Sequence, residues 1–270
     1  MKKHHVVKLS VLDLGLFRSP GPGLGNLLFP ICRAYIAAKK NNEVFVKPTI
    51  RQIKIGPVLR REKDLRTYGD IFRHRGILDW TLWLLSKLGK KHHEKSASKS
   101  GKFIIYSGLK NQFHDLEGCS SEIKRFLISQ SKYGIEHTTS YDVAIHIRQG
   151  DFSPAGTAGD GQSIQTSLDW YSKALDVAKS NLNLSNPNVV IFTDGDPLHI
   201  QRELGLTNVV IDDSKNALLS ILRISEAKVI IGSRSTFSLW GAFLSEGISI
   251  WPKNFDLEKY VKVTKKHISI

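Results

Sequence analysis

Cysteine and long apolar runs are scarce in this chain of 270 residues. Its two cysteines, Cys32 and Cys119, are too few and too differently placed for a disulfide framework or a zinc cluster, which predicts a reducing compartment. No run reaches the roughly 18 apolar residues of a membrane span. The start Met-Lys-Lys-His-His also lacks the apolar core of a signal peptide. We therefore expect a soluble cytoplasmic protein.

Acidic residues are few relative to basic ones, 25 against 39, so the formal net charge is +14. A charge of this size is compatible with a nucleic-acid partner. However, the chain contains no recognisable RNA- or DNA-binding module, and its aromatic residues do not alternate with basic ones along one strand. The sequence therefore predicts no nucleic-acid partner.

The positive charge is concentrated in residues 47–102, around an apolar segment at 77–88 whose hydrophobic residues recur at helical spacing. Two interpretations of this basic amphipathic helix are open. In the first, it packs into the N-terminal domain and is followed by a solvated basic loop at 90–93. In the second, it lies on an anionic membrane, where each Lys or Arg contributes about 1 kcal/mol. The protein would then be peripheral at the inner face of a membrane.

Runs rich in β-branched residues alternate with helical patterns along the chain. Strand patterns lie at 6–14, 44–47, 103–107, 143–148, 189–193, 209–211, 229–231 and 248–251, and helical patterns at 30–40, 121–130, 167–180 and 216–226. This alternation predicts an α/β fold with parallel sheets and crossover helices. The length allows two domains of roughly 150 residues or fewer. We expect them at 1–135 and 136–270, because the polar stretch 131–139 separates a helix from the fourth strand.

Polar residues with a phosphate-binding character follow the strand at 143–148. The segment 146–152 reads His-Ile-Arg-Gln-Gly-Asp-Phe, so His146 and Arg148 project from the carboxyl end of a buried strand, where ligands bind in α/β sheets. The guanidinium of Arg148 presents a rigid fork suited to a phosphate or a carboxylate. The alternative is that Arg148 is tied to a structural carboxylate, such as that of Asp151.

Near the N-terminus, a Gly-rich turn links a strand to a helix. The glycines of segment 19–29 include Gly23 and Gly25, and they leave the N-terminus of the helix uncovered for an anion or a sugar hydroxyl. No Gly-Lys-Ser/Thr follows, so the turn is not a Walker loop. Asn26 is the polar residue of this turn, and it alternatively caps the helix.

Two further strands end in polar residues. The strand at 189–193 is followed by Asp194, which could accept a hydrogen bond from a base or a ribose or belong to an ordinary turn. After the strand at 229–231 come Ser233, Ser235 and Thr236, whose hydroxyl and backbone groups could cradle a phosphate. An N-cap cluster is the alternative.

Taken in this order, the four segments resemble the fucosyltransferase superfamily, which includes the α-1,2- and α-1,6-fucosyltransferases and the protein O-fucosyltransferases. The bacterial α-1,2 branch is the most similar. The resemblance rests on Gly-Leu-Gly-Asn-x-x-Phe at 23–29, His-x-Arg-x-Gly-Asp-Phe at 146–152, Phe-Thr-Asp at 192–194 and Ser-x-Ser-Thr-Phe-Ser at 233–238. It spans nearly the whole chain.

The resemblance implies an inverting, metal-independent glycosyltransferase of the GT-B type, with two Rossmann-like domains facing a cleft. The donor would be GDP-fucose, bound by the C-terminal domain, and no cofactor is implied. The acceptor would be a glycan, bound on the side of the N-terminal domain, in the synthesis of a cell-surface polysaccharide.

The resemblance also implies roles for individual residues. Arg148 would contact the donor pyrophosphate, and Asn26 would position the donor phosphate or the fucose. The expected catalytic set is Arg148, Asn26 and Asp151, and the expected donor-binding set is Gly23, Gly25, His146, Asp194, Ser233, Ser235, Thr236 and Phe237. Asp194 would lie near the guanosine and Phe237 near the base. The choice of general base is open between Asp151, His114 and Asp115.

The chain departs from the family pattern at two positions. Gln149 stands where relatives often have a second Arg, and Leu27 stands where they have Gln. Two alternatives to a GDP-fucose enzyme therefore stay open. The first is a related glycosyltransferase that uses another nucleotide sugar. The second is a non-catalytic homologue that binds a nucleotide or a sugar.

Overall fold

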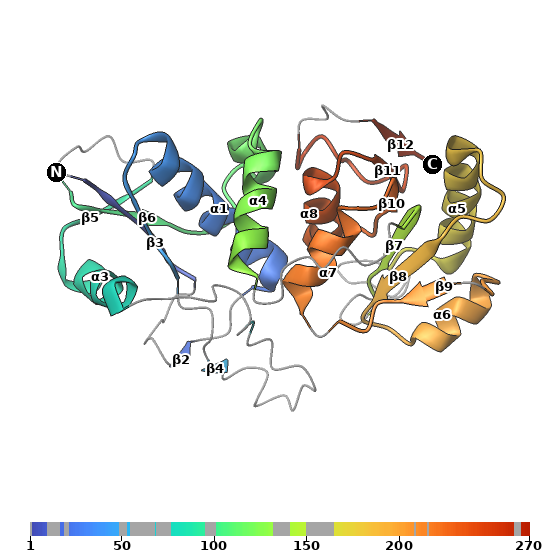
Figure 1. Cartoon of the computed structure of the whole chain (residues 1–270), viewed down its shortest axis with the longest axis horizontal. Coiled ribbons are helices and arrows are strands. Elements are labelled where there is room, and N and C mark those ends of the chain that lie inside the picture. The colour runs from blue at the N-terminus through green and yellow to red at the C-terminus, as the bar shows by residue number, and fades with distance from the viewer. Residues whose placement is uncertain are drawn as a thin grey trace. The chain divides into compact units, whose positions relative to one another are not determined.

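The computed structural model describes residues 2–9, 17–18, 22–48, 53–54, 68, 77–94, 101–131, 141–149, 165–207, 209–214, 216–261 and 266–270. The chain divides into two compact units, Met1–Gly134 and Ile135–Ile270. Each unit contains a parallel sheet with helices packed on it (Figure 1). The predicted α/β class with parallel sheets is therefore confirmed. The division of acceptor and donor binding between the two units stays a prediction.

The N-terminal unit is built on a four-stranded sheet with the order β3-β1-β6-β5. Its elements are β1 (His4–Val7), β2 (Phe17–Arg18), α1 (Leu24–Lys40), β3 (Val44–Val46), β4 (Ile53–Lys54), α3 (Ile77–Leu88), β5 (Lys91–His93), β6 (Phe103–Tyr106), a 3-10 helix η1 (Gln112–Leu116) and α4 (Ser120–Gln130). The short strands β2 and β4 pair only with each other. Helix α3 covers one face of the sheet because Leu82 and Trp83 pack against alternate strand residues such as Val6 and Phe103.

Helix α1 begins earlier than the sequence predicts. It starts at Leu24 rather than at residue 30, so Gly25 and Pro30 both lie inside it. Proline inside a helix removes one backbone hydrogen bond. Here the first two turns are almost wholly buried, including Leu28 and Phe29 at 0% exposure, and this burial offsets the loss. The predicted Gly-rich turn is therefore shorter and ends at the N-cap residue Gly23.

The C-terminal unit is built on a six-stranded sheet with the order β12-β11-β10-β7-β8-β9. Its elements are β7 (Val143–Ile147), α5 (Leu168–Leu182), β8 (Val189–Thr193), α6 (Pro197–Glu203), β9 (Val209–Ile211), α7 (Ala217–Ile224), β10 (Val229–Ile231), α8 (Thr236–Leu244), β11 (Ile248–Trp251) and β12 (His267–Ser269). Numbered along the chain, the strands of this sheet run 3-2-1-4-5-6, which is the doubly wound order. The order reverses between β7 and β10.

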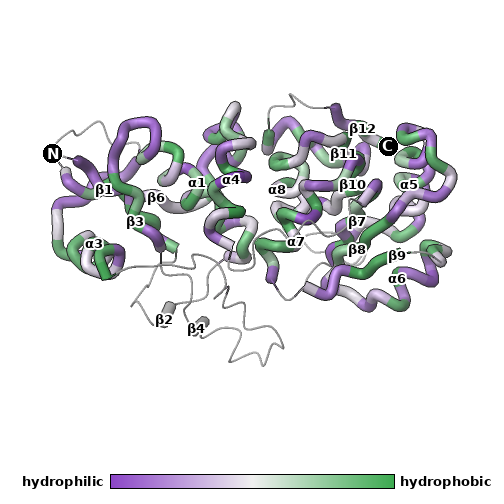
Figure 2. The backbone as a smooth tube through the Cα atoms, viewed as in Figure 1, coloured by the Kyte–Doolittle hydropathy of each residue, from purple (hydrophilic) through white to green (hydrophobic). Residues whose placement is uncertain are grey.

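Helices cover both faces of this sheet, with α5 and α6 on one side and α7 and α8 on the other (Figure 1). Val143, Ile145 and Ile147 of β7 pack toward α5, whereas Ala144 packs toward α7 and α8. Because both faces are covered, the central strands are mostly hydrophobic, as the green of β8 shows in Figure 2. By this alternation, His146 belongs to the face covered by α8.

The structure corrects the prediction of a solvated loop at residues 90–93. Lys91–His93 form β5, the edge strand of the N-terminal sheet, which pairs with β6. A short strand of lysine and histidine has no apolar alternation from which a strand could be predicted. Charged residues on an edge strand discourage pairing with other chains. The strand predicted at 6–14 is seen as β1, ending at Val7, and residues 10–14 lie outside the described part of the chain.

Candidate functional site

The carboxyl ends of β7 and β10 lie side by side at the reversal of strand order. Ile145 pairs with Ile231 in the register of these parallel strands, so the residues that follow both strands emerge at one edge of the sheet. In doubly wound sheets, ligands bind at this edge because the connections from the two strands leave toward opposite faces. Arg148 follows β7 at this position, and Ser233 follows β10.

Asp194 fixes the position of Arg148. Its Oδ2 lies 2.7 Å from Nη1 of Arg148, and its Oδ1 accepts a 2.8 Å hydrogen bond from the backbone N–H of Gln149. The pairing arises because β8, which ends at Thr193, is the neighbour of β7. Arg148 is therefore tied to a carboxylate, and that carboxylate belongs to Asp194. The alternative partner Asp151 lies outside the described residues.

Arg148 nevertheless keeps a surface that a ligand can reach. Its side chain is 28% exposed, while its Nη1 is engaged with Asp194. A guanidinium has five N–H donors in a fixed plane, so the contact with the carboxylate orients the whole group at this edge of the sheet. The contact with the guanosine implied for Asp194 stays a prediction, since the contact observed for this carboxylate is with Arg148.

His146 is a buried, neutral residue of the site. Its side chain is 6% exposed, and its Nδ1 lies 3.0 Å from Oγ of Ser233 and 2.6 Å from Oγ of Ser238. Burial lowers the pKa of His146 to about 3, with Asp194 opposing and Arg148 reinforcing the effect. The imidazole is thus uncharged near pH 7 and is too weak a base to take a proton there. It joins the end of β7 to the turn before α8.

A cluster of serine hydroxyls shapes the N-terminus of α8. Ser235 is the N-cap and accepts a hydrogen bond from the backbone N–H of Ser238, which confirms the capping interpretation for this residue. The backbone N–H of Ser233 donates to Oγ of Ser238 at 3.0 Å, and the hydroxyls of Ser233 and Ser235 lie 3.1 Å apart. Thr236 begins α8. A helix N-terminus of this kind attracts anions.

Phe237 and Ser238 complete this arrangement. The ring of Phe237 stacks on that of His146, with ring centroids 4.9 Å apart. The contact of Phe237 with a base stays a prediction. Ser238 is absent from the predicted site although its hydroxyl contacts both His146 and Ser233. The available signal was its place as the last residue of the Ser-x-Ser-Thr-Phe-Ser segment at 233–238.

The remaining predicted residues lie in the N-terminal unit. Gly23 is the N-cap of α1, and Gly25 is buried within the helix. Asn26 is the third residue of α1, so it does not occupy the capping position. Its Oδ1 is buried without a hydrogen-bond partner among the described residues. The structure thus brings seven predicted residues together in the C-terminal unit, namely His146, Arg148, Asp194, Ser233, Ser235, Thr236 and Phe237.

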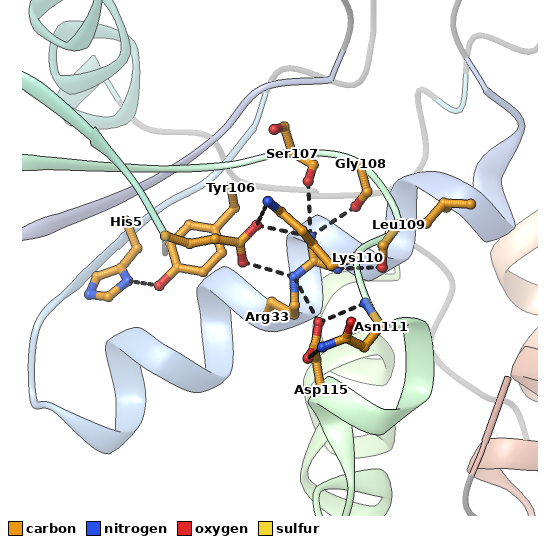
Figure 3. A network of polar contacts seen from close by, with 10 residues as sticks. His5, Arg33, Tyr106, Ser107, Gly108, Leu109, Lys110, Asn111 and Asp115 are labelled. Atoms are coloured by element: carbon orange, nitrogen blue, oxygen red, sulfur yellow. Dashed lines mark hydrogen bonds and ion pairs between the residues drawn. The ribbon is translucent and has the colours of Figure 1, made fainter. Parts of the chain in front are cut away.

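A buried arginine organises the loop after β6 in the N-terminal unit (Figure 3). The guanidinium of Arg33, 6% exposed, forms two hydrogen bonds with the carboxylate of Glu94 at 2.9 and 3.2 Å. It also donates to the backbone carbonyls of Ser107, Gly108 and Leu109. Loss of this arginine would leave the nearly buried carboxylate of Glu94 with the more distant Lys110, 3.9 Å away, as its cationic neighbour. The loop that leads into η1 therefore depends on Arg33.

Two of the expected general-base residues lie on η1. Asp115 accepts hydrogen bonds from the backbone and side-chain nitrogens of Asn111, at 3.2 and 2.8 Å, and lies 4.0 Å from Nε of Arg33 (Figure 3). His114 beside it is exposed. Asp115 thus stabilises its own turn, and a role of either residue as a base stays a prediction.

Among the described residues, no group of three or more His, Cys, Asp and Glu side chains is placed to hold a metal ion. None of the helices that the structure describes is long and apolar enough to cross a membrane.

The depressed pKa of His146 predicts a specific pH dependence of stability. The unfolded chain binds a proton on this histidine below about pH 6.5, whereas the folded protein binds it only near pH 3. The stabilisation that depends on uncharged His146 is therefore fully present above pH 6.5, and it is lost as the pH falls from 6.5 toward 3. Between pH 5.5 and 4.5, His146→Asn should reduce the slope of the unfolding free energy by about 1.4 kcal/mol per pH unit.

The measurement is urea-induced unfolding of the parental protein and its variants at several pH values. His199→Asn removes an exposed histidine of the same unit and is the matched control, with a slope like that of the parental protein. Equal slopes for the parental protein and His146→Asn would contradict the buried, neutral state.

The chain matches mammalian α-1,2-fucosyltransferases in sequence. Galactoside alpha-(1,2)-fucosyltransferase 1 of Sus scrofa is 24% identical over 143 residues, which cover 46% of this chain and 34% of that protein. The protein of the same name from Aotus azarae is 22% identical over 243 residues, covering 77% and 58%. The chain thus spans between a third and three fifths of the lengths of these relatives. No family model matches the chain.

Solved fucosyltransferases are also among the structures with some similarity. The NodZ alpha-1,6-fucosyltransferase soaked with GDP-fucose has a TM-score of 0.44 and 13% identity, covering 91% of this chain and 94% of that one. POFUT1 in complex with GDP-fucose has a TM-score of 0.47 and 10% identity, and the match covers 100% of this chain and 98% of that one. The sequence matches confirm the resemblance to the fucosyltransferase superfamily that the motifs predict.

Proposed function

We propose that the protein is an inverting glycosyltransferase that transfers fucose from GDP-fucose to a glycan acceptor. The C-terminal unit would bind the donor and the N-terminal unit the acceptor, for the synthesis of a cell-surface polysaccharide. One observation carries the proposal. Arg148 stands at the strand-order reversal, oriented by Asp194, in a sheet edge that also holds the N-terminus of α8. The relationship to α-1,2-fucosyltransferases supports fucose as the sugar.

The proposed transfer reaction requires positive charge at this edge of the sheet. Breaking the bond between a sugar and a nucleoside diphosphate builds positive charge on the sugar ring and negative charge on the departing phosphate. Donors that are already oriented stabilise this developing charge most, because they need no reorganisation during the reaction. Arg148 meets this condition through its contact with Asp194. His146 does not carry charge and serves to hold the α8 turn in place.

Gln149 bears on which sugar is transferred. The side chain of Gln149 packs against Gly195, where an added Cβ would lie 2.1 Å from Oε1. An uncharged residue here leaves Arg148 as the cation that β7 contributes. A related transferase with another nucleotide sugar is therefore the second function to test.

Substitution of Arg148 tests the proposed chemistry. Charge-assisted hydrogen bonds contribute about 1.5–3 kcal/mol, and each 1.36 kcal/mol of transition-state stabilisation is about a factor of ten in rate. Arg148→Ala should therefore lower turnover of GDP-fucose about tenfold to a hundredfold, measured as release of GDP with and without a glycan acceptor. Arg202→Ala, which removes an exposed arginine of α6, is the control and should retain the parental rate.

The unfolding temperature, measured with a panel of nucleotides and nucleotide sugars, separates the alternative donors. Thermal stabilisation by GDP and GDP-fucose but not by UDP sugars supports the proposed donor, and a clear UDP preference contradicts it. Binding of a nucleotide sugar without any hydrolysis or transfer would indicate a non-catalytic homologue. Parental turnover by Arg148→Ala would overturn the role of this arginine.

We further propose that the enzyme works in the cytoplasm at an anionic membrane surface, through α3. Helix α3 packs into its unit by Leu82, Trp83 and Ser86, and most of its other apolar residues are exposed. The exposed set is Ile77, Leu78, Trp80, Leu84, Leu85 and Leu88, at 40–88% exposure. Helix α3 thus packs into the N-terminal unit by one side, as the first interpretation has it, and leaves a second set of apolar side chains exposed. Figure 2 shows α3 as a mixture of hydrophobic and hydrophilic residues.

The charges around α3 favour an anionic surface over a neutral one. Lys87, Lys90 and Lys91 are exposed at and after the end of the helix. Lysines beside an apolar helix face add electrostatic attraction to acidic lipid headgroups. Such a placement would suit an enzyme that extends a lipid-linked sugar.

Vesicle binding tests the membrane proposal. The variant carrying Ile77→Gln, Leu84→Gln and Leu88→Gln should lose at least about tenfold in partitioning to phosphatidylserine-containing vesicles, because apolar area drives insertion. The control carries Leu198→Gln and Val210→Gln, two exposed apolar residues of the other unit, and should bind as the parental protein does. Flotation measures the bound fraction. Equal binding by parental protein and α3 variant, or no binding by either, would rule out this role of α3.

A further inference from the structure

Arg234 follows β10 at the edge of the sheet where Arg148 follows β7. Ile231 pairs with Ile145, and each arginine is the third residue beyond that pair. Neighbouring strands lie about 4.8 Å apart, so the two residues emerge on either side of the strand-order reversal. Arg234 stands at the apex of a tight turn, because the backbone N–H of Ser235 donates to the carbonyl of Ser233 at 2.7 Å.

Among the described residues, Arg234 has no carboxylate oxygen within 4.0 Å, whereas Arg33, Arg125, Arg148 and Arg223 each have one. Its Nη2 donates to the neutral amide oxygen of Asn254. Its Nε is buried and has no hydrogen-bond partner in the described part of the chain. A half-buried cation without a counter-ion is costly on its own and is suited to an anionic ligand.

A buried hydroxyl lies near Arg234. Tyr171 of α5 is 0% exposed. Burial raises the pKa of Tyr171, the hydroxyl of Thr166 and the charge of Arg234 lower it, and the charge of Asp194 raises it. Arg234 and Asp194 therefore lie near enough to act on the same buried hydroxyl. Since Asp194 also contacts Arg148, the two arginines belong to one polar cluster.

The described residues of this cluster have a net positive charge. They are two guanidinium groups, the carboxylate of Asp194 and the neutral imidazole of His146. The remaining charge is of the sign that a diphosphate requires, and the N-terminus of α8 adds to it.

We propose that Arg234 is a second cationic contact for the diphosphate of the donor, with one guanidinium on each side of the strand-order reversal. This inference rests on the proposed function, since it assigns a ligand to the same sheet edge. Asn254 positions the group through Nη2, which leaves the other nitrogens of the planar fork for phosphate oxygens. Arg234 then contributes to binding of the ground-state donor and to stabilisation of the departing nucleotide.

Nucleotide titration of Arg234 variants tests the proposal. Arg234→Gln removes the charge and retains a donor for Asn254, and Arg234→Lys retains the charge without the fork. Lys228→Ala, at the amino end of β10, removes a charge from the opposite edge of the same sheet and is the matched control. Isothermal titration with GDP should give an affinity at least about tenfold weaker for Arg234→Gln, an intermediate affinity for Arg234→Lys and the parental affinity for Lys228→Ala. Guanosine, which lacks phosphates, should bind the variants and the parental protein alike.

The outcomes separate this inference from the proposed function. If the parental protein prefers UDP or ADP to GDP, the proposed donor is wrong, and the Arg234 variants are compared on the preferred diphosphate. Parental affinity of both Arg234 variants for that diphosphate overturns the inference, even where the proposed function holds. If no nucleoside diphosphate binds the parental protein, both are overturned. If Arg234→Gln has lost its fold, as judged by its unfolding temperature, Arg234→Lys decides by the same comparison.

Discussion

The reversal of strand order between β7 and β10 is the constraint on which the candidate site depends. All described strands of the C-terminal sheet run in parallel, so their carboxyl ends share one edge. The helices α5 and α8, which follow the two strands, lie on opposite faces of the sheet. The edge between them is therefore left to polar residues, and Arg148, Asp194 and Ser233 converge there from three different strands.

Burial divides these polar residues into two kinds. His146 and Ser238 are buried, and their hydrogen bonds join β7 to the turn before α8. Because burial keeps His146 uncharged, the cluster avoids the cost of a buried cation at its centre. Arg148 and Asp194 are about 30% exposed, and their charges remain available at the surface. The buried, uncharged residues thus form the base of the site. The charged residues lie at the exposed edge, where an anionic ligand would bind.

Local patterns predicted much of this arrangement, and long-range pairing did not follow from them. The β-branched runs gave the bounds of Val189–Thr193 and Val229–Ile231 as observed, since buried parallel strands are hydrophobic throughout. The sequence also left an N-cap cluster open as an alternative for the turn at 233–236, and Ser235 is the observed N-cap. The pairing of Arg148 with Asp194 spans 46 residues and depends on which strand lies beside β7, which no local pattern contains. Arg234 was missed for the same reason, because its register opposite Arg148 requires the strand order. The early start of α1 was missed because a proline at position 30 masks a helix that burial stabilises.

The central claim is that the carboxyl edge of β7 and β10 binds the diphosphate of a nucleotide. The most direct measurement is a crystal structure of the full chain soaked with GDP. The account predicts phosphate density at this edge, with at least one phosphate oxygen within hydrogen-bond distance of the Arg148 guanidinium. GDP bound elsewhere on the protein, or bound at this edge without contact to Arg148, would contradict it.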